Sequence, residues 1–238
     1  MILALETSAD TSSVALLDGS SGALKTEVNF PSRQQLSQTL MGRLDEALQE
    51  ASATLDDLRA LAVSLGPGSF TSLRIGVATA KCLAHARGLP IVGVPTHQVI
   101  ARGAQPAAGR LILVATRARA NEVYATLLRA RDDGGFEEVR PCEVLSPAEA
   151  TQRACKAAAG KAQQALLCGD AAGMCAEAAP AGAALTVADS DPTPKASDLA
   201  RLAALRLQTE GPDDLFSLKP LYARPSQAEA KLEVDLGL

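Results

Sequence analysis

Short apolar runs separated by polar turns occupy the start of this chain. Residues 2–7 and residues 14–17 are apolar runs of strand length. Residues 25–30 alternate polar and apolar side chains, as a strand with one buried face does. Asp18-Gly19 lies between the second and third runs and is a typical hairpin signal. The pattern predicts three antiparallel strands joined by short turns.

The following segments change to helical periodicity. Leucines recur every four residues from Leu36 to Leu48, which marks one apolar face of a helix. Residues 61–65 and 91–94 read as buried strands, and residues 71–87 between them read as a second helix. Gly88 is a typical stop for that helix. The first half of the chain therefore reads β-β-β-α-β-α-β.

The same order of elements recurs in the second half, after a short helix at residues 96–104. The expected strands cover residues 110–116, 122–129, 136–144, 165–168 and 185–188, and the expected helices cover residues 147–159, 171–179 and 196–209. A duplicated unit of this order is typical of the RNase H-like, actin-like (ASKHA) α/β fold with two βββαβα-type subdomains. We predict an N-terminal subdomain over residues 1–104, and a C-terminal subdomain over residues 105–238 that ends in a loosely packed tail.

The helix expected at residues 71–87 is apolar on two sides. One stripe holds Leu73, Val77, Ala80 and Ala84, and the other holds Ile75, Ala78, Cys82 and Ala86. A helix that is apolar on both faces is usually covered on both faces. Either both covers come from this chain, or one of them is a partner protein.

Composition restricts the chemistry that the chain can carry. The net charge is −4, aromatic residues make up 3% and Trp is absent, so neither long-range attraction to a phosphate backbone nor a base-stacking platform is expected. The five cysteines form no CxxC pair, and the two histidines do not share a helical face, so no metal site is predicted. The start of the chain lacks the basic region of a signal peptide, and no run approaches the ~20 apolar residues of a membrane span. We expect a cytoplasmic protein with no membrane segment.

Two segments are candidates for a phosphate turn. Glu6-Thr7-Ser8 ends the first strand, where actin-like ATPases place a carboxylate and a hydroxyl-rich turn. Residues 66–71, with the sequence GPGSFT, join a strand to a helix but lack the Gly-Lys-Ser/Thr of a P-loop. The preferred interpretation of the second segment is structural: its glycines allow a tight turn, and Ser69 or Thr71 caps the helix. The corresponding strand of the second half ends in Arg117 rather than an acid. The candidates therefore form an incomplete catalytic set, comprising Glu6, Thr7, Ser8, Gly66, Gly68, Ser69 and Thr71.

Motifs along nearly the whole chain resemble the TsaB (YeaZ-type) family. They cover residues 2–8, 13–16, 66–71, 73–76, 89–94, 122–124 and 220–224, and the GPGSFT run followed by RIG is the most specific. Three positions depart from the family pattern. Gln35 stands where His is common, Ser72 stands where Gly is usual, and Arg117-Ala118-Arg119 replaces Asp-Ala-Arg. The last change puts any carboxylate role at that site in doubt.

The resemblance implies a non-catalytic subunit of the bacterial machinery that makes threonylcarbamoyladenosine in tRNA. Such a subunit would bind and activate a TsaD-type catalytic subunit, assemble with a TsaE-type ATPase, and reach tRNA mainly through the complex. It could form a homodimer when alone. No cofactor of its own is expected, and any ATP or ADP would lie on the partners or at a shared interface.

By the same resemblance, the contact with the partner uses the first two helices. The interface residues expected there are Leu36, Leu40, Leu44, Arg74, Ile75, Ala78, Thr79 and Cys82. Two alternatives from other classes remain. One is an active actin-like ATPase or kinase that uses Glu6, Thr7 and Gly68. The other is a glycoprotease-type peptidase, as the family was once labelled, which would require bound zinc.

Overall fold

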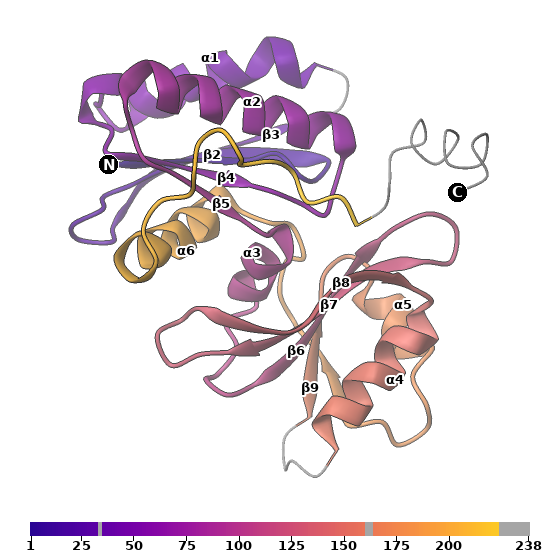
Figure 1. Cartoon of the computed structure of the whole chain (residues 1–238). Helices are drawn as coiled ribbons and strands as arrows, with labels where there is room; N and C mark the ends of the chain where they lie inside the picture. The colour runs from indigo at the N-terminus through magenta and orange to yellow at the C-terminus, as the bar shows by residue number, and fades with distance from the viewer. Residues whose placement is uncertain (33–34, 160–163, 224–238) are drawn as a thin grey trace.

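Two five-stranded mixed sheets form the frame of the molecule (Figure 1). The computed structural model describes residues 1–32, 35–159 and 164–223. The first sheet has the order β3-β2-β1-β4-β5, and its strands are β1 (Ile2–Glu6), β2 (Thr11–Leu17), β3 (Leu24–Pro31), β4 (Ala60–Ser64) and β5 (Ile91–Val94). The second sheet has the order β10-β9-β6-β7-β8, and its strands are β6 (Leu111–Arg117), β7 (Val123–Ala130), β8 (Phe136–Leu145), β9 (Ala165–Cys168) and β10 (Leu185–Val187).

Both sheets repeat one topology. In each, the first three strands are antiparallel neighbours, and the last two strands run parallel to the first. This repeat confirms the predicted duplicated RNase H-like fold, and the strands lie within a few residues of their expected positions.

Helices cover the faces of both sheets. They are α1 (Leu36–Glu50), α2 (Phe70–Arg87), α3 (Thr96–Gly103), α4 (Pro147–Ala158), α5 (Ala172–Glu177) and α6 (Ala196–Thr209), with a short 3₁₀ turn at Leu55–Asp57. α1 and α2 lie on one face of the first sheet and α6 lies on the other (Figure 1). We call this sheet with α1, α2 and α6 the first lobe, and the second sheet with α4 and α5 the second lobe. α3 lies between the lobes.

The alternation of side chains in β1 explains its continuous apolar run. Leu3 and Leu5 belong to the core beneath α1 and α2, whereas Ile2 and Ala4 belong to the core against α6. Successive side chains of a strand point to opposite faces, so a central strand with both faces covered is apolar throughout. On the α6 side the facing residues are largely alanines, which allow the helix to approach the sheet closely.

The strands of the two sheets lie on either side of the predicted division at residue 104, whereas one helix from beyond it packs on the first sheet. α6 was expected in the C-terminal subdomain, yet it packs across β1, β2 and β5 of the first sheet. The chain after α6 also returns to the first lobe, where Leu218 is buried and the amide of Leu221 donates to the carbonyl of Leu65 at 2.7 Å. The first sheet needs a cover on its second face, and the order of elements along the chain does not say which helix supplies it.

The expected loose tail is only partly described. Residues 219–223 are held against the first lobe by the Leu221 amide and by the side chain of Tyr222. Residues 224–238 lie outside the described residues. Across the ranges that the structure describes, no helix is both long and apolar enough to cross a membrane.

Candidate functional site

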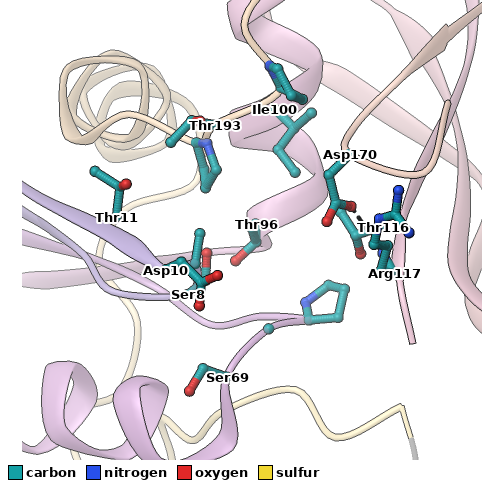
Figure 2. A pocket seen from close by; sticks show the side chains of 15 residues that line it. Ser8, Asp10, Thr11, Ser69, Thr96, Ile100, Thr116, Arg117, Asp170 and Thr193 are labelled. Atoms are coloured by element: carbon teal, nitrogen blue, oxygen red, sulfur yellow. Dashed lines mark hydrogen bonds between the residues drawn. The ribbon is translucent and has the colours of Figure 1, made fainter. Parts of the chain in front are cut away.

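A cavity of about 480 Å³ opens between the two lobes (Figure 2). Ser8 and Asp10, just after β1, face Thr116 and Asp170 of the second lobe across it, and Thr96 of α3 lies between them. Most of its polar groups are hydroxyls, and its charged residues are Asp10, Arg117 and Asp170. The carboxyl ends of β1 and β6 therefore lie on opposite sides of one cavity, as expected for two copies of the same folding unit.

Glu6 does not reach this cavity. Its carboxylate is fully buried and accepts hydrogen bonds from the amide of Ser8 at 2.8 Å and from the Ser8 hydroxyl at 2.5 Å. Burial raises the pKa of Glu6, and interactions with Ser8 and with the Ser64 side chain oppose this rise. The other carboxylate oxygen, Oε2, is buried as well. Glu6 thus lies in the protein interior, where it cannot contact a ligand in the cavity.

Thr7 is also buried, and α2 crosses directly above it. A Cβ at Gly76 would lie 2.2 Å from the Thr7 hydroxyl oxygen, so only glycine fits there. Gly76 of the RIG motif and Thr7 of the first motif are therefore packed in close contact. Of the three residues Glu6-Thr7-Ser8, only Ser8 lines the cavity.

The GPGSFT segment is tied to the same turn. The amide of Ser69 donates to the carbonyl of Ser8 at 2.8 Å, and a Cβ at Gly68 would lie 2.3 Å from that carbonyl oxygen. Gly66 has a φ of 103°, a value that favours glycine, and the Gly66–Pro67 peptide bond is cis. These contacts support the structural interpretation of the glycines.

The capping prediction for this segment is wrong in one respect. Ser69 is the N-cap residue of α2, but no side chain accepts a capping hydrogen bond at this end of the helix. The Ser69 hydroxyl instead donates to the Ser72 hydroxyl at 3.0 Å. Thr71 lies inside the first turn and lines a second, smaller hollow next to Ser69.

The second lobe contributes a turn that the sequence only hinted at. Asp170 accepts a hydrogen bond from the amide of Arg117 at 2.9 Å, and both residues line the cavity. Gly169 has a φ of 98°, and a Cβ there would lie 2.1 Å from the Ala115 carbonyl oxygen. The signal was the Cys-Gly-Asp-Ala-Ala-Gly run, but only the fold brings Asp170 to the end of β6.

His97 joins α3 to the second sheet. Its Nδ1 lies 2.6 Å from the Thr126 hydroxyl and its Nε2 lies 2.9 Å from the Thr116 hydroxyl. Burial lowers the pKa of His97 to about 3, so the ring is neutral at physiological pH. No cluster of three or more potential metal ligands occurs in the parts of the chain that the structure describes.

The second apolar stripe of α2 is only partly covered by the described residues of this chain. Ile75 is half-buried and packs against the core of the first lobe, whereas Ala78, Cys82 and Ala86 are exposed. Of the neighbouring residues, Arg74 is exposed and Thr79 is half-buried. The first stripe, in contrast, packs into the core beneath α2. The described residues of this chain therefore do not fully cover both faces of α2, which was the first of the two alternatives.

The three leucines expected at the partner interface occupy a different place. Leu36, Leu40 and Leu44 are buried in the first lobe's own core, with exposed fractions of 3%, 1% and 0%. A side chain that packs on its own sheet cannot contact a partner directly. Periodicity marked the buried face of α1 correctly, but that face is turned inward.

Aromatic side chains stand at the edges of the exposed α2 face. The Arg74 guanidinium lies 3.8 Å from the centroid of the Phe70 ring, and its Nε donates to the Tyr222 hydroxyl at 3.0 Å. Further along, the Lys81 ammonium donates to the carbonyls of Phe216 and Leu218 at 3.1 and 2.9 Å. The Phe216 side chain itself is 79% exposed.

Sequence reasoning did not name these aromatic residues as site residues. The signal was the late motif at residues 220–224, whose Tyr222 meets Arg74 of the motif at 73–76. The two motifs are far apart in the chain and touch only in the folded molecule.

Comparisons with known proteins agree with this architecture. A family model described as "TsaD: tRNA N6-adenosine threonylcarbamoyltransferase" matches residues 31–205. The Escherichia coli protein named "tRNA threonylcarbamoyladenosine biosynthesis protein TsaB" is 33% identical over 147 residues, which cover 61% of this chain and 62% of that relative. The solved structure of YeaZ from Pseudomonas aeruginosa matches with a TM-score of 0.77 and 26% identity, over 93% of this chain and 98% of that one. The chain belongs to the TsaD family, as a TsaB (YeaZ-type) member.

The sequence and structure matches differ in their extent. The chain spans less than two thirds of the length of the E. coli TsaB sequence that it matches. A ROK family protein from Streptococcus pneumoniae matches with a TM-score of 0.50 and 11% identity, over 88% of this chain and 98% of that one, which shows an actin-like fold alone.

The three departures from the TsaB pattern lie at the start of α1, in the first turn of α2 and at the end of β6. Gln35 is the N-cap residue of α1, and Ser72 bonds to Ser69 in the first turn of α2. At the end of β6, where the family has Asp, Arg117 places its side chain at the cavity, and Asp170 supplies a carboxylate beside it. A carboxylate is thus present at this strand end, but it comes from Asp170, in the turn after the neighbouring strand β9.

Proposed function

We propose that this chain is a non-catalytic subunit that binds and activates a TsaD-type catalytic subunit, which transfers a threonylcarbamoyl group to adenosine in tRNA. Its membership of the TsaD family and its similarity to TsaB support a role in making threonylcarbamoyladenosine. The observation that carries the activating role is the exposed part of the second apolar stripe of α2, at Ala78 and Cys82, with exposed aromatic residues beside it.

Such a surface suits a protein partner. Exposed apolar patches edged by polar groups are typical of interaction sites, and aromatic and Arg side chains are enriched at interface centres. Arg74 is held by Phe70 and Tyr222, so it is already ordered before a partner binds. A TsaE-type ATPase is a further partner within this proposal, and a second copy of the chain would use the same stripe when the TsaD-type subunit is missing.

The cavity between the lobes supports a silent role better than a catalytic one. Glu6, the residue at the position of the expected catalytic carboxylate, is buried and bonded to Ser8. A group that cannot reach substrate cannot serve as a general base.

An active ATPase or kinase is the second candidate, and one observation favours it. The cavity has the size of a small-ligand site and holds Arg117, Asp10 and Asp170 along with several hydroxyls. This alternative predicts tight ATP binding and turnover by the isolated chain. Calorimetry that detects no nucleotide binding removes it. No observation favours the peptidase alternative.

Substitution of Ala78 tests the proposed role. Ala78 is exposed, so Ala78→Arg leaves the monomer folded but places an unpaired charge in any interface formed by this stripe. We expect association with the TsaD-type subunit to weaken roughly a hundredfold, which corresponds to about 3 kcal/mol, and tRNA modification to fall with it.

The matched control is Gln152→Arg, which adds the same side chain to an exposed position of α4 in the second lobe. This variant should bind and stimulate the partner as the wild-type chain does. A TsaD-type subunit that modifies tRNA fully without this chain would refute the activating role. Normal complex formation by Ala78→Arg would place the interface elsewhere.

A further inference from the structure

A second large cavity lies at the other end of α3. Its volume is about 500 Å³, and it is lined by the end of α3, the first half of α6 and the hairpin between β7 and β8. α6 belongs to the first lobe and the hairpin belongs to the second, so this cavity also lies where the lobes meet. Its charged lining consists of Arg102, Arg131, Arg201 and Asp198.

Arg102 and Arg201 keep hydrogen-bond donors that the described residues do not use. Arg102 donates from Nη1 to the carbonyl of Gly134 at 3.0 Å, but its Nε is buried without a partner among the described residues. Leaving a buried donor unpaired is costly, and a ligand is one way to satisfy it. Arg201 contacts Asp198 at 3.5 Å, which is long for a hydrogen bond of this kind.

Arg206, on the same helix as Arg201, shows what a structurally committed arginine looks like. Its guanidinium donates to three acceptors, which are the Gly93 carbonyl and the carboxylates of Glu210 and Asp213. Arg131 differs from it, because it pairs with Asp133 at 2.7 Å while its side chain stays 52% exposed. Exposed pairs of this kind contribute little and exchange easily for another anion.

We propose that this cavity binds a phosphate group, either of a free phosphate compound or of an RNA backbone. A guanidinium is planar and can donate two parallel hydrogen bonds to a phosphate, which makes arginine the usual residue at such sites. Here three guanidiniums from three elements line the cavity, against the carboxylates of Asp198 and of Asp133, which pairs with Arg131, in a chain whose net charge is −4. The positive charge of this cavity is therefore local and opposite in sign to the molecule as a whole.

The hairpin lies close against Arg102 and α6. A Cβ at Gly134 would lie 3.0 Å from Arg102 Nη1, and a Cβ at Gly135 would lie 3.0 Å from Leu205 Cδ2. A phosphate bound between Arg131 and Arg201 would connect the hairpin of the second lobe to α6 of the first. This inference goes beyond the proposed function, because it concerns a ligand of the isolated chain and requires no partner subunit.

The test uses the full chain alone, with three probes. Inorganic phosphate and pyrophosphate are titrated by calorimetry, and labelled tRNA is titrated by fluorescence anisotropy at two salt concentrations. Arg201→Gln and Arg131→Gln remove one guanidinium each. Arg153→Gln is the control, since it removes an exposed arginine of α4 that pairs with Glu143. Arg131 is half exposed, so its variant should fold even if Arg201→Gln does not.

We expect each cavity variant to lose about tenfold or more in affinity, because a charged hydrogen-bond donor is lost, while Arg153→Gln keeps wild-type affinity. Binding of phosphate or pyrophosphate with this pattern supports a free phosphate compound. Binding of tRNA alone with the same pattern supports an RNA backbone. The proposal is overturned if no probe binds the wild-type chain, or if all three variants bind equally well.

Discussion

Gly68 holds the start of α2 against the turn after β1, and replacing it with alanine should loosen both. A Cβ at this position would lie 2.3 Å from the Ser8 carbonyl oxygen and 2.8 Å from the Ser8 Cβ. The obstacle is backbone, so it cannot swing aside as the end of a flexible side chain can. The amide of Ser69 donates to the same carbonyl oxygen at 2.8 Å, so moving the segment also weakens that bond.

The size of the effect follows from these two contributions. Forcing an extra carbon into a tightly packed place costs about 1–3 kcal/mol, and losing a backbone hydrogen bond costs about 1 kcal/mol more. For a chain of this length each kcal/mol lowers the melting temperature by about 2–4 °C. We therefore expect Gly68→Ala to lower the free energy of unfolding by about 2–4 kcal/mol and the melting temperature by about 5–15 °C.

Thermal unfolding followed by circular dichroism measures the change, and Gly42→Ala is the control. Gly42 lies inside α1 with nothing within 4 Å of its added Cβ. Alanine favours a helix over glycine by about 1 kcal/mol, so this variant should melt slightly above the wild-type chain. The two substitutions are chemically identical and have opposite expected signs. If Gly68→Ala melts within about 2 °C of wild type, the close approach of the two turns does not constrain the fold as argued.

Two buried titratable groups give predictions with opposite dependence on pH. Burial lowers the pKa of His97 to about 3 from 6.5, so just below pH 6.5 only the unfolded chain takes up a proton. The contribution of His97 to the free energy of unfolding therefore falls by about 1.4 kcal/mol for each pH unit below 6.5. The stability of His97→Gln, measured by urea unfolding, should depend less on pH between 6.5 and 5. Equal slopes for the two proteins would contradict this. Burial raises the pKa of Glu6 above 4.5, so its contribution to stability is present below pH 4.5 and is lost as pH rises through the folded pKa. Glu6→Gln cannot ionise, so it should gain stability relative to wild type between pH 4.5 and pH 8, and a difference that stays constant over this range would show that Glu6 is not destabilised by burial.

Local periodicity was enough to predict nearly all elements of this fold. The apolar residues on the buried face recur every two residues in a strand and every three to four residues in a helix. This periodicity can be seen without knowledge of distant contacts. The duplicated topology followed because only a few folds accommodate such an order twice. The GPGSFT glycines were interpreted as structural, and the close packing at Gly68 supports this, but the turn at Ser8 that Gly68 packs against is far away in the chain and was not predicted.

The candidate site was less accessible to such reasoning. Asp170 reaches the end of β6, and Tyr222 reaches Arg74, through contacts between segments far apart in the chain. Glu6 stood at an expected position, but its burial and its bonds to Ser8 were visible only in the folded molecule. Residue type and spacing suggest what a side chain can do, whereas solvent access decides whether it does so.

The sequence by itself determined the elements, their repeat and the presence of apolar faces on α1 and α2. Only the tertiary structure decided what covers each face: Leu40 of α1 meets its own sheet, Ala78 of α2 meets solvent, and α6 crosses back to the first lobe. The physical reason is that the hydrophobic effect is non-directional and does not select a particular partner surface. A periodic apolar stripe indicates that a face of the helix is to be buried, and the packing of the whole chain determines which surface covers that face.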